Sequence, residues 1–402
     1  MIAENRRSRA HIDKTLLILV FAMSIFGVLA VSVATYSTTS SPDAPLLNHI
    51  VESSSAVRQC IFLFLAPFVV AVILNIPYDM LRRRTELIYY GSTILIFVVW
   101  IFNRAEGVKA WLDIIWGFTI QPSEFAKLAM ILMMAKTLSR YDRPMSTFRE
   151  FVRIMALVLV PCAIILLSGE TGSMMVIVFL FAVMLYFSNV DMKLLLTMAA
   201  VAILGVLALY GFMVATGSDD YRLARIMAFI NPDLSPEKDA YQQLNSKMAI
   251  GSGGLFGIGM FVDGSMSQLN YVPADQTDFI SATIGEAFGF VGCFTILIVY
   301  LLIILRMLYL ARYTRDKFGM LIITGVMGML LFHVFENIGM TLGLMPITGI
   351  PLPFLSYGGS NMVTNMGGVA LVLNVTKNRS LSATVLTPQT QANPYRFHTR
   401  RI

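Results

Sequence analysis

The sequence predicts an all-α polytopic membrane protein with about ten transmembrane helices. Of its 402 residues, 56% are hydrophobic and only 13% are charged, whereas soluble globular proteins carry about 25% charged residues. The mean hydropathy is +0.71, so the apolar excess extends over most of the chain. A single soluble core does not need this much apolar surface, but a bundle of helices in a bilayer does.

Each predicted span is a mostly apolar stretch close to the length that crosses the hydrocarbon core, about 20 residues. The spans are 15–37, 56–76, 86–102, 122–138, 151–168, 171–188, 192–216, 278–305, 319–343 and 358–376. The first is too long for the apolar region of a signal peptide, and no small-residue cleavage site follows it. A large polar loop, 217–277, separates the seventh span from the eighth. Its apolar stretches predict that it folds against the bundle.

The positions of Lys and Arg predict the orientation. With ten spans both termini share one side, and 22 of the 30 basic residues fall there: Arg6, Arg7, Arg9, Lys14, Arg82, Arg83, Arg84, Lys136, Arg140, Arg143, Arg149, Arg153, Lys193, Arg306, Arg312, Arg315, Lys317, Lys377, Arg379, Arg396, Arg400 and Arg401. Because basic residues favour the cytoplasmic side, we expect cytoplasmic termini and an extracytoplasmic loop. The net charge of +6 is then a topology signal, and nucleic acid is not an expected partner.

This topology divides the chain into three parts. Residues 1–14 form a cytoplasmic tail, residues 15–378 form the transmembrane domain with the extracytoplasmic loop 217–277, and residues 379–402 form a polar, flexible cytoplasmic tail. The three cysteines lie far apart in apolar runs without metal-ligand spacing, so we interpret them as buried hydrophobic residues.

The sequence QPSEFAK at 121–127 begins the fourth span with two charged residues. Pro122 suits the first turn of a helix, and Glu124 and Lys127, three residues apart, share a face. They form either an internal ion pair at a helix start or a polar patch facing a cavity. The sequence leaves both interpretations open.

A glycine-rich run, SKMAIGSGGLFGIG at 246–259, lies within the large loop. It does not match the phosphate-binding or dinucleotide-binding glycine patterns. It is either a flexible surface loop or a backbone that closely approaches a ligand or the membrane surface. Lys247, beside it, is a candidate phosphate contact.

Asp278 lies where the large loop meets the eighth span. It is either a helix-capping residue or a carboxylate held at the membrane boundary, where it could accept a proton from a sugar hydroxyl. Glu286, eight residues later, is expected on nearly the same helical face.

The run PITGIPLPFLSYGGS at 346–360 contains Pro and Gly residues that break helices. Non-helical backbone at membrane depth occurs only inside protein or beside a water-filled cavity. This run is therefore either a structural re-entrant segment or a cavity wall. Glu336, in the preceding span, is a further buried acid, and His333 is interpreted as packed rather than catalytic.

Together, QPSEFAK, SKMAIGSGGLFGIG, TDFI at 277–280 and PITGIPLPFLSYGGS resemble the SEDS family (shape, elongation, division and sporulation), of the RodA and FtsW type. The resemblance runs from about Asp13 to Asn374. It implies a ten-span fold with a large extracytoplasmic loop between spans seven and eight, and a bacterial plasma-membrane location. The sequence at 346–360 resembles RodA more than FtsW, which favours a role in cell elongation over division or sporulation.

The resemblance also implies an enzyme. It would be a peptidoglycan glycosyltransferase that polymerises lipid II, the undecaprenyl-pyrophosphate-linked disaccharide peptide, with a class B penicillin-binding protein as partner. The family's essential acid falls on Asp278, which would deprotonate the acceptor sugar. Lys127, Lys247, Arg225 or a divalent cation such as Mg²⁺ or Mn²⁺ would stabilise the leaving pyrophosphate. Glu124 and Ser356 are further expected substrate contacts.

The sequence departs from the family pattern at four residues: Ala110, Glu170, Ala274 and Gln276. The usual acid after Pro273 is absent, with Asp275 as a candidate substitute. These changes affect expected substrate contacts, not the reaction class. Two other functions remain alternatives. A lipid II flippase would need polar groups along the full depth of the membrane, and a non-catalytic activator of the penicillin-binding protein would need no reactive carboxylate.

Overall fold

The computed structural model describes residues 12–36, 44–103, 110–113, 119–216, 225, 229 and 239–385. Within them a helix occupies every predicted span: α1 (Lys14–Ala34), α3 (Ser54–Asn75), α4 (Tyr78–Phe102), α5 (Pro122–Leu138), α6 (Phe148–Leu167), α7 (Thr171–Phe187), α8 (Met192–Ala215), α11 (Ile280–Arg312), α12 (Lys317–Thr341) and α13 (Gly359–Val385). The shorter elements are α2 (Leu46–Glu52), α10 (Asp239–Ser252) and an antiparallel pair, β1 (Leu112–Asp113) with β2 (Thr119–Ile120). The predicted all-α fold class is confirmed.

Seven of the described helices are long and apolar enough to cross a membrane: α1, α3, α4, α6, α8, α11 and α12. The other three predicted spans are helical but differ from these. Helices α5 and α7 have 17 residues each, and α13 carries many polar side chains. The chain is therefore a multi-pass membrane protein. Both predicted tails lie largely outside the described residues, as do most positions of the loop between 217 and 238.

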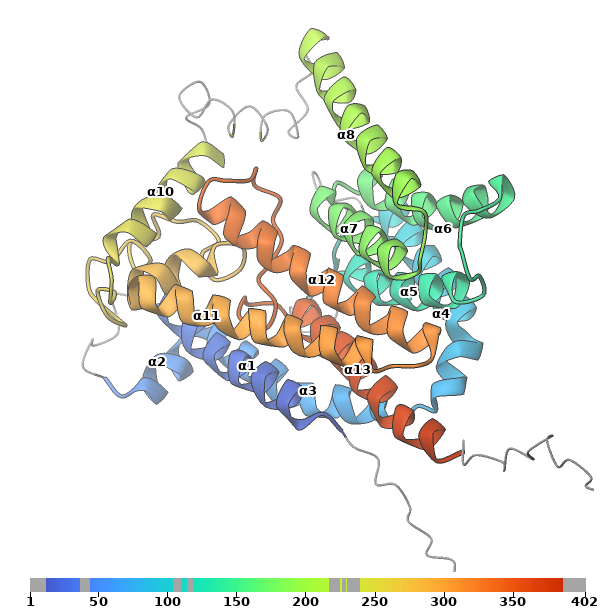
Figure 1. Cartoon of the computed structure of the whole chain (residues 1–402). Coiled ribbons are helices and arrows are strands. Elements are labelled where there is room, and N and C mark those ends of the chain that lie inside the picture. Colours follow the sequence, from blue (N-terminus) through green and yellow to red (C-terminus); the bar gives the residue numbers. More distant parts are fainter. Residues whose placement is uncertain are drawn as a thin grey trace, which may run out of the picture.

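Helix α12 forms the centre of the bundle. Within its most apolar stretch 83% of the residues are buried, and it packs against α5, α7, α11 and α13. Figure 1 shows it running between α11 and the pair α5 and α7. At Gly328 an added Cβ would lie 3.1 Å from the Val183 side chain. Small residues of this kind let membrane helices approach closely.

Helix α8 lies at the periphery. None of its most apolar stretch is buried, and Figure 1 shows it standing away from the bundle. Side chains such as Leu204 and Phe212 are largely exposed. In a bilayer these apolar surfaces contact lipid tails, so their exposure is expected of an outer transmembrane helix.

The described part of the large loop folds against the bundle, as predicted. Its helix α10 packs on α11 and α12. The Gln243 side chain donates to the carbonyls of Met340 and Met345, at 3.1 and 2.9 Å, and the Ser246 hydroxyl donates to the Thr341 carbonyl at 3.0 Å. These bonds fix α10 to the end of α12 and to the residues that follow it.

Helix α11 is interrupted at Gly289, whose φ is 63° and ψ −161°. The freed backbone groups pair with residues 253–259, which we call the Gly-rich segment: Ile258 and Gly259 donate to the carbonyls of Glu286 and Ala287, and Phe290 and Val291 donate to those of Gly254 and Leu255, at 2.9 to 3.1 Å. At Gly253 an added Cβ would lie 1.9 Å from the Gly285 carbonyl oxygen. The glycines therefore serve close packing on a broken helix, a role that neither interpretation of this run had named.

Candidate functional site

A cavity of about 370 Å³, the central cavity, opens where the N-terminal ends of α5, α7 and α13 meet the segment before α11. Its polar lining residues are Thr119, Gln121, Glu124, Lys127, Glu170, Ser173, Arg225, Thr277, Asp278, Thr348, Tyr357, Ser360 and Asn361. Small-molecule sites usually have volumes of about 300 to 1,000 Å³. Of the predicted site residues, Asp278, Glu124, Lys127 and Arg225 come together here.

Asp278 precedes α11 and does not cap it. The residue before the helix is Phe279, whose side chain makes no capping hydrogen bond, and the half-buried Asp278 carboxyl faces the central cavity. Burial raises the pKa of this carboxyl to about 6, although the charge of Arg225 opposes the rise. A carboxyl with such a pKa is largely ionised at neutral pH and can still accept a proton.

The Asn337 side chain holds the backbone around Asp278, and Gly349 lies close to its carboxylate. The fully buried Asn337 amide donates to the carbonyls of Asp278 and Ile350, at 2.7 and 2.8 Å. At Gly349, where φ is 71°, an added Cβ would lie 3.4 Å from the Asp278 carboxylate. The run 346–358, which we call the Pro-rich segment, is therefore tied to the candidate base. It is the cavity wall that the sequence left as one of two interpretations.

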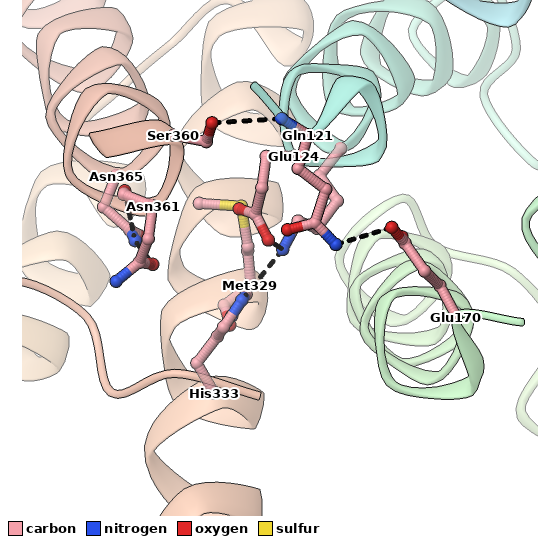
Figure 2. Close-up of polar contacts among 9 residues, drawn as sticks. Gln121, Glu124, Glu170, Met329, His333, Ser360, Asn361 and Asn365 are labelled. Atoms are coloured by element: carbon pink, nitrogen blue, oxygen red, sulfur yellow. Dashed lines mark hydrogen bonds and ion pairs between the residues drawn. The ribbon is translucent and has the colours of Figure 1, made fainter. Parts of the chain in front are cut away.

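Glu124, Lys127 and His333 form a buried chain of polar groups. Figure 2 shows Glu124 and His333 pointing toward the same place. The Lys127 Nζ atom lies 2.7 Å from Glu124 Oε1 and 3.0 Å from His333 Nε2. His333 Nδ1 lies 2.7 Å from the Met329 carbonyl oxygen, so Nδ1 carries the hydrogen and Nε2 accepts from the ammonium. Lys127 is thus held between Glu124 and His333 at the cavity. Both interpretations of the 121–127 motif apply, since the pair is internal and also lines the cavity.

A second polar chain joins α5 to α7 and α13 (Figure 2). The Gln121 side chain donates to Glu170 Oε1 at 2.6 Å, and its backbone N–H donates to the Ser360 hydroxyl at 3.1 Å. Burial raises the pKa of the Glu170 carboxyl. Glu124 and Glu170 each keep one buried carboxylate oxygen, Oε2, without a partner among the described residues. The central cavity therefore holds acceptors for a donor-bearing ligand or a cation.

Lys247 and Ser356 do not line the central cavity. Lys247 is exposed on α10, with its Nζ atom over Gly343, at the end of α12. Ser356 is fully buried, and its hydroxyl accepts from the Leu352 N–H at 2.8 Å inside the Pro-rich segment. Ser356 thus has a structural contact in this protein.

Glu286 does not share a face with Asp278, because Asp278 lies outside the helix. Its carboxylate accepts from the backbone N–H groups of Met266 and Ser267, at 2.6 and 3.1 Å, and so ties the loop to α11. Asp275 is not a substitute in the central cavity either, since it lines a separate cavity. The departures at Ala274 and Gln276 thus lie beside the central cavity, whereas Glu170 is part of it.

The site residues that the sequence reasoning did not name include Asn337, Thr348 and Asn361. Thr348 donates to Glu336 Oε1 at 3.0 Å, and Asn361 lines the cavity while accepting from Asn365 at 2.6 Å (Figure 2). An amide inside an apolar span was the available signal for Asn337. It adjoins Glu336, which did attract attention.

Comparisons with known proteins identify the family. The model of the FtsW, RodA and SpoVE cell cycle proteins matches residues 13–381. Stage V sporulation protein E of Bacillus subtilis is 33% identical over 326 residues, or 80% of this chain and 87% of that protein. Peptidoglycan glycosyltransferase MrdB of Escherichia coli is 29% identical over 375 residues, 93% of this chain and 95% of that protein.

Solved structures of related proteins point to the same family. A chain of a peptidoglycan synthase complex that coordinates polymerization and crosslinking superposes with a TM-score of 0.72 at 25% identity, over 92% of this chain and 98% of that chain. The rod shape determining protein RodA of Thermus thermophilus gives a TM-score of 0.65 at 26% identity, over 92% and 97%. With the cavity, its carboxylate and the order of the spans in place, this chain belongs to the FtsW, RodA and SpoVE family of multi-pass membrane proteins.

Proposed function

We propose that this protein is a peptidoglycan glycosyltransferase that polymerises lipid II at the central cavity. The observation that carries the proposal is the Asp278 carboxyl, half-buried in a polar cavity beside two cations, Lys127 and Arg225. Relatives that match nearly the whole chain are named peptidoglycan glycosyltransferases. Membership of the family and the chemistry of the site therefore support the same reaction.

In the proposed step, Asp278 accepts the proton of the acceptor 4-hydroxyl, and the resulting oxygen attacks the anomeric carbon of the donor. A carbon–oxygen bond forms, the bond from that carbon to the phosphate oxygen breaks, and the pyrophosphate leaves with inversion. Asp278 suits this task because its pKa of about 6 leaves it ionised near neutral pH. The Lys127 ammonium and the Arg225 guanidinium, which both line the central cavity, would stabilise the charge on the leaving group.

A divalent cation, Mg²⁺ or Mn²⁺, is part of the proposal. Among the described residues no three His, Cys, Asp or Glu side chains gather to hold a metal. The unpaired oxygens of Glu124 and Glu170 could supply two ligands, which fits Mg²⁺, an ion commonly held by one or two carboxylates together with substrate phosphates. When bound, the cation would neutralise pyrophosphate charge.

The distribution of polar groups favours a polymerase over a flippase. The polar lining gathers at one end of the bundle, at the starts of α5, α7 and α13. Beyond it, residues 128–135 of α5 and 366–373 of α13 are apolar or glycine. A flippase would need polar groups along the whole depth, whereas a polymerase needs them where the head group enters.

We further propose that the protein lies in the bacterial plasma membrane with both termini in the cytoplasm, and that it works with a class B penicillin-binding protein. The 22 basic residues on one predicted side support the orientation. The related synthase complex, which coordinates polymerization and crosslinking, supports a crosslinking partner. Among the possible biological roles we propose cell elongation, because the sequence of the Pro-rich segment resembles RodA more than FtsW.

The test uses the purified full chain, with and without the partner, incubated with fluorescent lipid II and analysed by gel for glycan length. We expect polymers from the unaltered protein, none from Asp278→Ala, and normal polymers from Asp142→Asn, an exposed acid on the opposite side. EDTA should reduce the yield. Undiminished polymerisation by Asp278→Ala would eliminate the proposed base, and lipid II translocation without polymer would favour the flippase.

A further inference from the structure

A second cavity, of about 310 Å³, lies beside the central one. Its lining is almost wholly polar and comes from the end of α1 and from the loop before α11: Thr35, Tyr36, Gln268, Asn270, Asp275 and Gln276. The residue pair 275–276 lines this second cavity, whereas the next pair, 277–278, lines the central cavity. Four consecutive residues therefore form the wall between the two.

This wall contains two buried acceptors without partners. Asp275 is only 6% exposed. Its Oδ1 accepts from the Gln276 N–H at 2.7 Å, but its Oδ2 has no partner among the described residues, and neither has Gln276 Oε1. Leaving a buried acceptor unpaired destabilises the folded protein, and more so when the acceptor is charged. Such a pair in the wall of an open cavity needs an explanation.

The surroundings are acidic. Asp263 accepts from Tyr36 and Gln268, two lining residues, at 3.1 and 2.7 Å, and the charge of Glu286 acts on Asp275. Among the described residues, none of these three carboxylates forms an ion pair. The second cavity therefore attracts a cation, although the chain as a whole carries a net charge of +6.

The number of free acceptors decides which cation fits. A Ca²⁺ ion takes about six to eight oxygen ligands, and a Mg²⁺ ion is commonly held by one or two carboxylates together with substrate phosphates, which the proposed function puts in the central cavity and not here. Here Gln268 is already engaged, since its Oε1 accepts from the Gly264 N–H at 2.6 Å and its Nε2 donates to Asp263. Asp275 Oδ2 and Gln276 Oε1 remain, with Asn270 on the same lining. A primary ammonium offers three donors, which matches two or three acceptors.

We propose that the second cavity binds a primary ammonium group on the peptide part of the substrate, with Asp275 and Gln276 as its acceptors. This inference rests on the proposed function. Asp275 and Asp278 are three residues apart, so their Cα atoms lie at most about 11 Å apart. A peptide linked to a sugar spans that distance in about three residues. One substrate molecule can thus place its sugar at Asp278 and its amine at Asp275.

The test compares two lipid II substrates, radiolabelled in the sugar, that differ only in whether the side-chain amine of the peptide is free or acetylated. With the unaltered protein we expect acetylation to raise KM about tenfold, the effect of losing a charge-assisted hydrogen bond, with kcat little changed. With Asp275→Asn the KM for the free amine should rise by a similar factor, and the difference between the substrates should disappear. Asp263→Asn is the matched control. It removes a negative charge next to the same cavity and should keep the difference in KM between the free and the acetylated substrate.

The outcomes separate the inference from the proposed function. If the unaltered protein polymerises both substrates with the same KM, the ammonium site is overturned and the glycosyltransferase stands. If Asp263→Asn loses discrimination as Asp275→Asn does, only a diffuse negative field acts, and the specific contact is overturned. Equal inhibition by the soluble peptide in its free and acetylated forms would also overturn the site. The comparisons on the unaltered protein need no variant, so a misfolded Asp275→Asn does not block the test. A protein that polymerises neither substrate would instead overturn the proposed function, and with it this inference.

Discussion

The Gly-rich segment and the Pro-rich segment both interrupt helical structure next to α11, yet only one of them borders the central cavity. The Gly-rich segment pairs its backbone groups with those released by the break at Gly289. The Pro-rich segment is held by side chains instead: Asn337 binds the Ile350 carbonyl, and Ser356 binds the Leu352 N–H. Its surface at Thr348, Gly349 and Ile350 remains free to line the cavity.

The difference shows what makes a helix-breaking segment available to a ligand. A segment whose N–H and C=O groups already satisfy a neighbouring helix has few left for recognition. A segment anchored from behind by buried side chains keeps one face open. Glycine content alone did not distinguish the two cases.

The largest expected effect concerns the carboxylate held against the Pro-rich segment. Asp278→Asn keeps the size of the side chain but removes the base, so kcat should fall by a factor of about 100 to 10,000, while thermal stability stays close to that of the unaltered protein. Gel-based polymerisation rates and melting curves measure both. An Asp278→Asn variant with more than half the normal rate would contradict the assignment of Asp278 as the base.

Packing of the Gly-rich segment gives the next largest effect, on stability. Gly253→Ala places a Cβ 1.9 Å from the Gly285 carbonyl oxygen, so we expect a loss of about 3 kcal/mol. Gly251→Ala, at the end of α10, meets nothing within 4 Å and should be neutral or stabilising by up to about 1 kcal/mol. Thermal unfolding in detergent compares them, and equal melting temperatures would mean that the segment does not brace α11.

The pH dependence of kcat/KM tests the central cavity separately from the Gly-rich segment. Because the folded pKa of Asp278 is raised to about 6, the active ionised form is lost as the pH falls through 6, and kcat/KM should then drop about tenfold per pH unit. Burial raises the pKa of Asp275 to about 7, and loss of its charge should raise KM. Asp275→Asn, whose KM is already raised, should therefore lose any fall in kcat/KM near pH 7 but keep this lower limb. A flat profile between pH 5 and 7 would contradict the assignment.

The smallest effect is expected at Lys247, which lies on α10 with its side chain over Gly343. Its side chain is exposed and outside the central cavity, so Lys247→Ala should change kcat/KM by less than about twofold. Lys127→Ala, which removes the cation from the cavity, provides the contrast and should reduce the rate far more. A tenfold loss in Lys247→Ala would place this lysine on the substrate path after all.

Much of the architecture followed from local pattern. The ten apolar runs became helices because a span must satisfy its own backbone hydrogen bonds in lipid, and Pro122 begins α5 as its position predicted. The Glu124–Lys127 pair followed from helical spacing. The helical-face argument for Asp278 and Glu286 was wrong, because periodicity applies only within a helix and Asp278 lies before α11.

The sequence by itself determined the membrane class, the order of the spans and the set of charged residues at their ends, since these depend on composition and short-range periodicity. Tertiary structure alone decided which of those residues meet. Gln121 bonds to Ser360 and Lys127 to His333 across more than 200 residues. Lys247, by contrast, lies outside the central cavity. The wall at 275–278 serves two cavities for the same reason: the packing of distant helices, which no local pattern specifies, determines which space each side chain faces.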